Sequence, residues 1–407
     1  MNTETEARVA PAQTDELLES ETPTTLRRNV PRSAQTTEAA TRAPSPSSNR
    51  NAGAKYTRTR PPRQKQKSKI SRVLLKVAAR FAFVLFSVIL VAAAGLYGVC
   101  AVVFLGPSTS SIDKLVTSTL EMSAAKFVPH IFFSQEEIDT ILANNTVVDM
   151  EDVTDPNLVV VPPITDDPIE ENDEWKDHPE GIRLEKIRGK TYRGYVLIIR
   201  DPSRVYVATS SDFTGSAPGL KISEAVSKEN AIAAINAGGF PDAGGVGAGN
   251  VPIGLTISQN RFLWGNRNQW YGAVVGFDKN NVLIVGNMSG QQAIDKGIRD
   301  CVCFGPILVV NGEPATVTGD SGSLNPRTAI GQRSDGAVIF LCVDGRMANS
   351  LGASYSDLID IMIEFGAVNA MNLDGGSSTH MVYKGEHVNV SSSLYGPRRM
   401  PTYFMVK

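Results

Sequence analysis

One uncharged run, from Phe81 to Leu105, divides this chain of 407 residues. About 20 apolar residues are enough to cross the hydrocarbon core of a bilayer as a helix, so the run predicts one transmembrane helix within residues 73–105. A buried core helix is the alternative, but such a helix usually keeps polar positions, which this run lacks. The run is also too long, and lies too far from Met1, for a cleaved signal peptide. The sequence therefore predicts a signal anchor.

The charges on either side of this run predict its orientation. Lysines and arginines are dense from Lys55 to Arg80, whereas residues 106–130 contain only Lys114 and Lys126 as basic residues. Because basic flanks stay on the cytoplasmic side, the N-terminus is predicted in the cytoplasm and everything after Gly106 outside it. Topology is a simpler explanation of the basic run than a nucleic-acid partner. The net charge of −2 likewise predicts no polyanionic partner. We expect a single-pass protein of the cell membrane.

The composition differs sharply along the chain. Residues 1–72 are rich in Thr, Ser, Pro, Ala, Glu and Arg, and such a segment buries too little apolar surface to fold, so it is predicted to be a disordered tail. Residues 106–180 are predicted to hold two short helices, at 110–122 and 134–142, and then an acidic, proline-bearing linker or stalk. The aromatic stretch 127–133 between the helices fits either the bilayer interface or packing on the outer domain.

Residues 181–407 have the pattern of one globular domain. Short segments rich in β-branched residues alternate with turn residues, for example at 182–187, 195–199, 328–332, 337–343 and 402–406, and the predicted helices are few and short. This pattern predicts a single β-rich domain of the α+β or mixed α/β class. Cys301, Cys303 and Cys342 lie in probable strands without zinc-site spacing, so we expect small buried groups rather than ligands or disulfides.

The most informative motif is Asn372-Leu373-Asp374-Gly375-Gly376-Ser377-Ser378-Thr379-His380. Apolar residues at helical spacing predict a helix from Tyr355 to Phe365, Gly366 fits a left-handed helix end, and residues 367–373 read as a strand. An aspartate thus follows a strand and precedes two glycines, which let a backbone approach a ligand closely. A tight turn without any function is an equally good interpretation of the motif alone.

Four further segments also place polar residues at the start or the end of a predicted apolar strand. They lie in the segments 236–240 (NAGGF), 325–331 (NPRTAIG), 343–346 (VDGR) and 398–402 (RRMPT). An arginine at the mouth of a strand suits a phosphate or carboxylate. Each segment alone is also compatible with a surface arginine or a turn.

Taken together, in this order and spacing, the five motifs resemble the phosphodiester glycosidase family over residues 182–407. The family includes bacterial surface proteins of exopolysaccharide biosynthesis, and its bacterial members have a similar anchor. The resemblance implies a hydrolase that cleaves the bond between a sugar anomeric carbon and a phosphodiester oxygen, with a glycan or glycosyl phosphodiester as substrate. Its implied catalytic residues are Asp374, Asp344 and Arg327. The implied substrate-binding residues are Asn236, Gly239, Arg346, Asn372, Gly375, Gly376, Ser377, Ser378, Thr379, His380 and Arg398.

The chemistry of this reaction suggests how the implied residues divide the work. An oxocarbenium-like transition state requires a carboxylate, for which Asp374 is the first choice and Asp344 the second. Charge neutralisation matters more than acid catalysis for a phosphate leaving group, so Arg327 is expected to clamp the phosphate. The amides of Gly375, Gly376 and Ser377 are expected to form an anion nest. The family often has a glycine where this chain has Ser377.

Two other function classes stay open. A non-catalytic module that binds an anionic wall polymer would need the arginines but not the aspartates. A serine hydrolase would use Ser377 or Ser378 with His380 or His387 as the base, although GGSST is not a G-x-S-x-G elbow. His380 is more often a structural hydrogen-bonding group in such a place. No cofactor is implied, a divalent metal stays an open alternative, and the oligomeric state is open.

Overall fold

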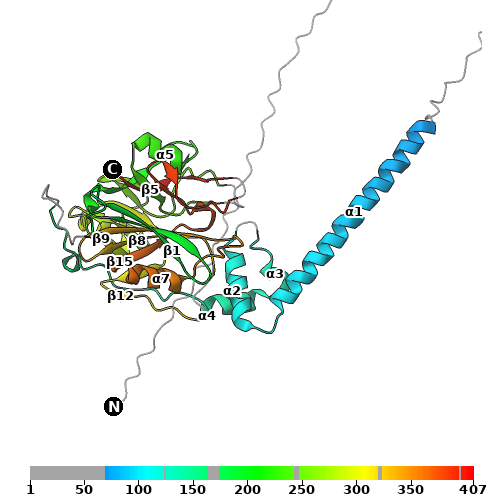
Figure 1. Ribbon diagram of the computed structural model, residues 1–407, viewed down its shortest axis with the longest axis horizontal. Helices are drawn as coiled ribbons and strands as arrows, with labels where there is room; N and C mark the ends of the chain where they lie inside the picture. Colours follow the sequence, from blue (N-terminus) through cyan, green and yellow to red (C-terminus); the bar gives the residue numbers. More distant parts are fainter. Residues whose placement is uncertain (1–68, 123–124, 164–173, 243–246, 320–322, 394–395) are drawn as a thin grey trace, which may run out of the picture. The chain divides into compact units, whose positions relative to one another are not determined.

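The computed structural model describes residues 69–122, 125–163, 174–242, 247–319, 323–393 and 396–407 (Figure 1). Nearly all of the predicted tail, residues 1–68, lies outside the described residues. The chain separates into two units, 1–72 and 73–407. All elements discussed below lie in the second unit, except the first residues of α1.

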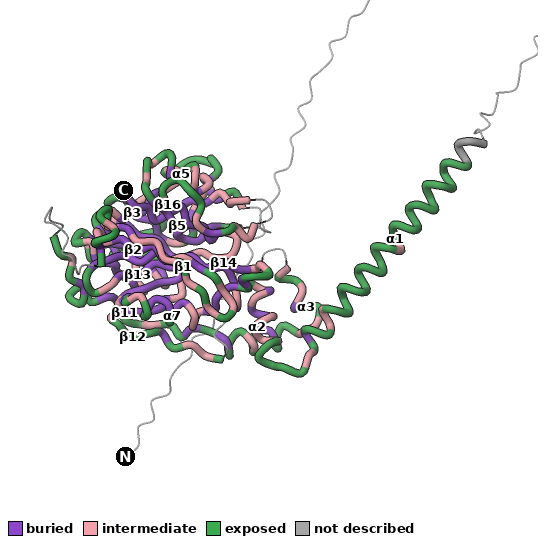
Figure 2. The backbone as a smooth tube through the Cα atoms, in the orientation of Figure 1, coloured by how far each residue is buried: buried purple, intermediate pink, exposed green. Residues whose placement is uncertain are grey.

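Helix α1 (Lys69–Phe104) contains the uncharged run. Its apolar side chains are exposed along its length, from Val73 at 60% to Val102 at 76% (Figure 2). The segment Val73–Phe104 is long and apolar enough to cross a membrane. A helix that is apolar all round and packs against no core is not a core helix of a soluble domain.

Short helices follow in the juxtamembrane region. They are α2 (Thr109–Leu120), α3 (Pro129–Phe132) and α4 (Gln135–Asn144), and α4 begins at a capping box between Ser134 and Glu137. Phe132, in the aromatic stretch, stacks on Phe104 of α1 with ring centroids 5.2 Å apart. This contact joins the stretch to the end of α1.

Part of the predicted linker lies against the globular domain. The amide of Val148 donates to Thr316 O, and that of Val160 donates to Ser334 O, both at 2.8 Å. Thr154 is buried, and its hydroxyl donates to Asn369 Oδ1 at 3.1 Å. Residues 146–161 therefore take part in the packing of the domain, although their composition resembles that of a free linker.

The described strands form one large sheet of seven strands, two sheets of five strands and one ribbon of two strands, all with antiparallel pairing. The large sheet has the order β1 (Ile182–Arg188), β2 (Arg193–Ile199), β14 (Val338–Asp344), β13 (Arg327–Arg333), β15 (Ala367–Leu373), β11 (Ile307–Val310), β12 (Glu313–Pro314). The β8 sheet has the order β7 (Arg261–Trp264), β6 (Thr256–Ser258), β10 (Ile298–Cys303), β8 (Trp270–Asp278), β9 (Leu283–Ser289). The β5 sheet has the order β17 (Glu386–His387), β16 (Met381–Tyr383), β5 (Ala233–Asn236), β19 (Thr402–Val406), β3 (Val205–Thr209). A small ribbon pairs β18 (Arg399–Met400) with β4 (Leu220–Lys221).

The large sheet has a hydrophobic layer on each face because its side chains alternate along each strand. In β14, Phe340 and Cys342 join the central core shared with the β8 and β5 sheets. The neighbouring Ile339 and Leu341 join a second cluster under α7 (Tyr355–Glu364). The remaining helices are α5 (Ile222–Glu229), against the β5 sheet, and α6 (Gly290–Asp295), against the β8 sheet. The prediction of a β-rich domain with few short helices is confirmed.

Antiparallel pairing brings three of the predicted motifs to one edge of the large sheet. Strand β13 lies between β14 and β15, with Arg327 opposite Val343 and Thr328 opposite Leu373. The start of β13 and the ends of β14 and β15 therefore meet. The helix and strand predicted before Asp374 are also confirmed, including the left-handed Gly366 at φ 82°.

Candidate active site

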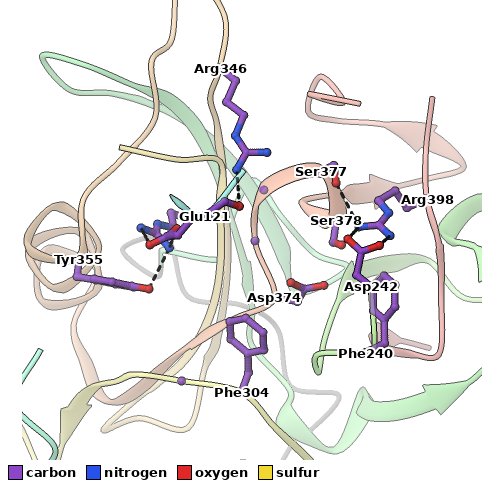
Figure 3. Close-up of a pocket in the computed structure, with 14 residues that line it drawn as sticks. Glu121, Phe240, Asp242, Phe304, Arg346, Tyr355, Asp374, Ser377, Ser378 and Arg398 are labelled. Atoms are coloured by element: carbon purple, nitrogen blue, oxygen red, sulfur yellow. Dashed lines mark hydrogen bonds and ion pairs between the residues drawn. The ribbon is translucent and has the colours of Figure 1, made fainter. Parts of the chain in front are cut away.

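A polar cavity of about 460 Å³ opens at this edge of the large sheet (Figure 3). Asp374 lies in its middle, Arg346 and Arg398 lie on opposite sides of it, and Phe304 lies beside it (Figure 3). The full lining consists of Glu121, Phe240, Asp242, Phe304, Gly305, Arg327, Arg346, Tyr355, Asp374, Gly375, Gly376, Ser377, Ser378 and Arg398. Eight of the residues implied by the family motifs are among them.

The backbone of Asp374 is fixed from the neighbouring sheet. Its amide donates to Ala237 O at 3.0 Å, and its carbonyl accepts from Asn236 Nδ2 at 2.5 Å. Asn236 Oδ1 in turn accepts from the hydroxyl of Thr328 and the amide of His380. The last residue of β5 thus joins β13, the Asp374 turn and the following strand, which explains why an asparagine is useful at this strand end.

The Asp374 carboxyl has an unusual acidity. Burial raises its pKa to about 6, although the hydroxyl of Ser378, the charge of Arg398 and the amide of Gly375 act in the opposite direction. A group with this pKa is mostly ionised at neutral pH yet only weakly solvated. Such a carboxylate can stabilise or attack a cationic sugar carbon, or serve as a base.

Arg398 and Asp242 form a second charged group beside Asp374. Two nitrogens of Arg398 bind the two carboxylate oxygens of Asp242, each at 2.7 Å, and Nη1 also donates to Ser377 Oγ. The guanidinium carbon lies 4.9 Å from the centre of the Phe240 ring. This two-point geometry orients the arginine and places its charge where it lowers the pKa of Asp374.

The guanidinium of Arg327 is engaged on all sides by protein groups. It is 3% exposed, and it binds Ala353 O, the hydroxyl of Tyr355 and both oxygens of Ser323. Its Nη1 also pairs with Glu121 Oε2 at 3.1 Å. Glu121 comes from the end of α2, and it further accepts from Ser323 Oγ and Asn325 Nδ2. In this arrangement Glu121 holds the place on Arg327 that an anionic substrate group would need.

Arg346 presents its guanidinium to the Asp374 turn. Its Nε and Nη2 both donate to Asn325 Oδ1, at 3.0 and 2.9 Å. Its Nη1 lies beside Gly376, where a Cβ would be 3.2 Å from it. Gly376 also has a φ of 60°, which favours glycine. Of the arginines in the cavity, Arg346 is therefore the best placed to give a hydrogen bond to a bound phosphate.

Six of the implied residues do not line this cavity. They are Asn236, Gly239, Asp344, Asn372, Thr379 and His380. Asn372 Nδ2 donates to Gly305 O at 2.6 Å, and Gly239 packs against the Phe304 ring, so these two support cavity-lining residues from behind. Thr379 and His380 are fully buried. Gly376 does not have its amide available for an anion nest, because it donates to Pro326 O at 2.8 Å.

Asp344 ends a strand as Asp374 does, but its carboxylate has a structural partner. Oδ1 accepts from the amide of Val390 at 3.0 Å, and Asn389 gives a further hydrogen bond. Burial raises the pKa of Asp344 against these hydrogen bonds. The loop 389–390 covers this strand end, which the sequence pattern of β14 does not reveal.

His380 is not placed beside a serine nucleophile. Its ring is fully buried, and the ring of His387 lies 5.9 Å from it. Burial lowers the pKa of His380 to about 4, and the charge of His387 adds to this. The described residues contain no group of three or more His, Cys, Asp or Glu that could hold a metal ion. The ionisable side chains that line the cavity are three carboxylates, three arginines and Tyr355.

The sequence did not single out the cavity residues Glu121, Phe240, Asp242, Phe304, Gly305 and Tyr355. Phe240 ends the NAGGF motif and Asp242 lies in the loop directly after it, so the position of this motif is the signal for both. Glu121 has no local signal, because it lies 206 residues before Arg327 in the chain.

Comparisons with known proteins agree with the motifs. Residues 229–407 match the sequence profile of the family described as phosphodiester glycosidase, NAGPA. The chain is 30% identical over 198 residues to the Bacillus subtilis SPbeta prophage-derived uncharacterized protein YomE, covering 46% of this chain and 29% of that protein. It is 27% identical over 131 residues to the N-acetylglucosamine-1-phosphodiester alpha-N-acetylglucosaminidase of Bos taurus, covering 28% of this chain and 25% of the bovine enzyme. The chain thus spans less than a third of either relative.

Among solved structures, the zebrafish N-acetylglucosamine-1-phosphodiester alpha-N-acetylglucosaminidase catalytic domain, auto-inhibited by its pro-peptide, aligns with a TM-score of 0.47 and 19% identity. The alignment covers 55% of this chain and 81% of the zebrafish chain. The profile match includes the motifs around Asn236, Arg327, Arg346, Asp374 and Arg398. Residues 229–407 therefore match the phosphodiester glycosidase family.

Proposed function

We propose that this protein is a membrane-anchored glycosidase that hydrolyses a sugar-1-phosphodiester bond in a glycan outside the cytoplasm. The observation that carries the proposal is the Asp374 carboxyl, with its raised pKa, between two arginines in one cavity (Figure 3). A glycosyl phosphodiester has an anomeric carbon that becomes cationic and a phosphate that gains negative charge. The cavity offers a group of opposite charge for each.

Asp374 is the residue assigned to the sugar carbon. An ionised carboxylate next to an oxocarbenium-like transition state lowers its free energy, either by forming a bond or by activating water. The cavity is enclosed enough to raise the pKa of this carboxyl, so its charge is poorly screened and interacts strongly with a nearby cation.

The arginines are assigned to the phosphate. Arg346 Nη1 faces the Asp374 turn, and Arg398 is oriented by Asp242 on the opposite side. Because a phosphodiester is already a good leaving group, charge neutralisation replaces strong acid catalysis. In this proposal Arg327 becomes available to the phosphate only when Glu121 releases it, and Asp344 has a structural role.

The anchor completes the proposal. Helix α1 spans the membrane once, with the basic N-terminal side in the cytoplasm and the glycosidase domain outside. The exposed apolar surface of α1 supports this assignment, since a water-soluble helix would not leave it uncovered. Surface or extracellular glycans would then be within reach of the cavity.

The test is turnover by the full chain in detergent. Wild-type protein and Asp374→Asn are incubated with a panel of glycosyl phosphodiesters, beginning with methyl N-acetylglucosaminyl phosphate, and the released phosphate ester is followed by ³¹P NMR. We expect turnover by the wild type and a loss of at least about 10³-fold in Asp374→Asn. An exposed-site control, Asp360→Asn on α7, should keep full activity.

Two results would overturn the proposal. Equal rates for Asp374→Asn and wild type would remove Asp374 from catalysis. Binding of phosphodiesters without turnover by the wild type, across the panel, would favour a non-catalytic binding module instead.

A further inference from the structure

A second cavity adjoins the candidate active site. It has a volume of about 540 Å³, and it shares Phe304, Gly305 and Tyr355 with the first cavity. Trp270, the first residue of β8, also lines it. The two cavities therefore meet at these three shared residues, and a substrate that extends from Asp374 past them would reach the second cavity. We call this second cavity the Trp270 groove.

Trp270 is an unusually exposed tryptophan. Its side chain is 61% exposed, whereas Trp175 is 4% exposed and Trp264 is packed edge to face against Phe213. A large aromatic side chain that is exposed beside a cavity offers a ligand an apolar surface, and covering that surface is favourable. The flat faces of sugar rings carry C–H groups that pack well on an indole, and the indole N–H can still donate a hydrogen bond.

The backbone next to Trp270 forms a β-bulge that hydrogen bonds stabilise. The pairing of β8 with β9 shifts register between Tyr271 and Val274, and Ala273 has a φ of 48°, which is strained for a residue with a side chain. Asn287 stabilises this bulge: its Oδ1 accepts from the amide of Ala273 at 2.7 Å, and its Nδ2 donates to Met150 O. Bulges of this kind re-aim neighbouring side chains. The bulge that follows the exposed Trp270 is thus stabilised by specific hydrogen bonds.

The polar lining of the Trp270 groove differs from that of the first cavity. Thr146 and Asp149 are exposed on its wall, and Asn287 lines it. None of the described residues that line the groove is a lysine or arginine, whereas three arginines line the first cavity. A hydroxyl, an amide and a carboxylate beside an aromatic face suit the hydroxyl groups of a neutral sugar. They do not suit a second phosphate.

We propose that the Trp270 groove binds an uncharged sugar unit next to the phosphodiester, so that the preferred substrate is a glycan with at least one further neutral sugar. The proposal rests on the proposed function for the position of the phosphodiester. It excludes a polymer with a phosphate on every unit as the best substrate, because the next phosphate would face Asp149 without a cation.

Direct binding tests the groove independently of turnover. The chain has three tryptophans, so the full chain with ¹⁵N-labelled tryptophan in detergent gives three indole N–H signals, and Trp270→Phe assigns one of them. The probes are four neutral tetrasaccharides: chitotetraose, maltotetraose, cellotetraose and mannotetraose. We expect at least one to shift the Trp270 signal and leave those of Trp175 and Trp264 in place. If none of the four shifts it, the proposal is overturned.

Kinetics tests whether the groove serves the same substrate. For a phosphodiester between N-acetylglucosamine and the binding tetrasaccharide, Trp270→Ala should raise KM about tenfold, the loss typical of one aromatic contact. Trp270→Phe should restore most of it, and the methyl phosphodiester should be hydrolysed equally by all variants. Ile363→Ala, an exposed site on α7, is the control. An unchanged KM in Trp270→Ala would overturn the proposal, whereas a wild type inactive on both substrates would count against the proposed function only.

Discussion

The raised pKa of Asp374 implies that this residue destabilises the fold. Its pKa is about 6 in the folded chain and about 3.9 in an unfolded one. Between these values the folded state binds more protons, so stability falls as the pH rises from about 4 to about 6, and the full penalty remains above that. Replacing the carboxyl by a neutral amide removes the penalty.

We therefore predict that Asp374→Asn is more stable than the wild type at pH 8, by on the order of 2 kcal/mol, while it loses activity. The gain should disappear near pH 4. Thermal melting at both pH values measures it, with the exposed Asp360→Asn as the control. A variant that is equally or less stable at pH 8 would mean that the Asp374 carboxylate is better solvated than the cavity indicates.

The same carboxyl sets a pH limit on the proposed reaction. If Asp374 works in its ionised form, kcat/KM should fall tenfold per pH unit below about pH 6. Arg398 lowers the pKa of Asp374 by its charge. Arg398→Gln should therefore move this acid limb to higher pH, in addition to any loss of rate. A limb that stays in place in Arg398→Gln would assign it to another group.

Glu121 brings a negative charge into a cavity that we assign to an anion. Its side chain is 38% exposed and pairs with Arg327. Removing this charge leaves Arg327 without an anionic partner and ends the repulsion of a phosphodiester. A partly exposed charge contributes about 1 kcal/mol, so we predict that Glu121→Gln lowers KM for a phosphodiester about fivefold. Glu136→Gln, exposed on α4, is the matched control. A higher KM would show instead that Glu121 orients Arg327 for the substrate.

The turn after β15 positions the proposed catalytic residue, Asp374, by its backbone conformation. Gly376 and Gly385 both have positive φ values, 60° and 83°, but a Cβ on Gly376 would meet Arg346 at 3.2 Å and one on Gly385 would meet nothing within 4 Å. An alanine with a positive φ lowers stability by about 1 kcal/mol at either position. The two sites therefore separate backbone strain from contact with the site.

We predict that Gly376→Ala and Gly385→Ala lower the free energy of unfolding by similar amounts, about 1–2 kcal/mol. Only Gly376→Ala should reduce kcat, because it displaces Arg346 and the Asp374 turn. Denaturant unfolding and turnover of both variants decide this. Comparable turnover in the two would mean that the turn tolerates a shift of Arg346.

The helices and strands of the domain can be predicted from local sequence, but the meeting of their ends at one cavity cannot. Hydrophobic spacing and a left-handed glycine predicted α7 and the start of β15, and a short continuous apolar run predicted β14. The meeting of Arg327 with the ends of β14 and β15 depends on antiparallel partners. The choice between Asp374 and Asp344 as cavity carboxylate depends on which strand end a distant loop covers. Contacts between distant parts of the chain, such as these, leave no periodic pattern in the sequence.

The globular domain extends beyond the segment that composition marks as folded. Val147 and Trp175 belong to the hydrophobic cluster under α7, and Val159 belongs to that of the β8 sheet. Burying three such side chains stabilises a fold by about 5 kcal/mol, which is comparable to the whole stability of many domains. The hydroxyl of Thr154 also accepts from the amide of Val285 at 2.9 Å, inside the core.

A chain of residues 181–407 should therefore be much less stable than one of residues 106–407. We predict a melting temperature at least about 10 °C lower, or aggregation, because the cores under α7 and the β8 sheet lose their cover. Thr154→Val in the longer chain keeps the side-chain volume and removes two buried hydrogen bonds, so it should cost about 1–3 kcal/mol. If the shorter chain melts at the same temperature and Thr154→Val is neutral, residues 106–180 are a tether, and the boundary at Gly181 that composition predicts is the boundary of the fold.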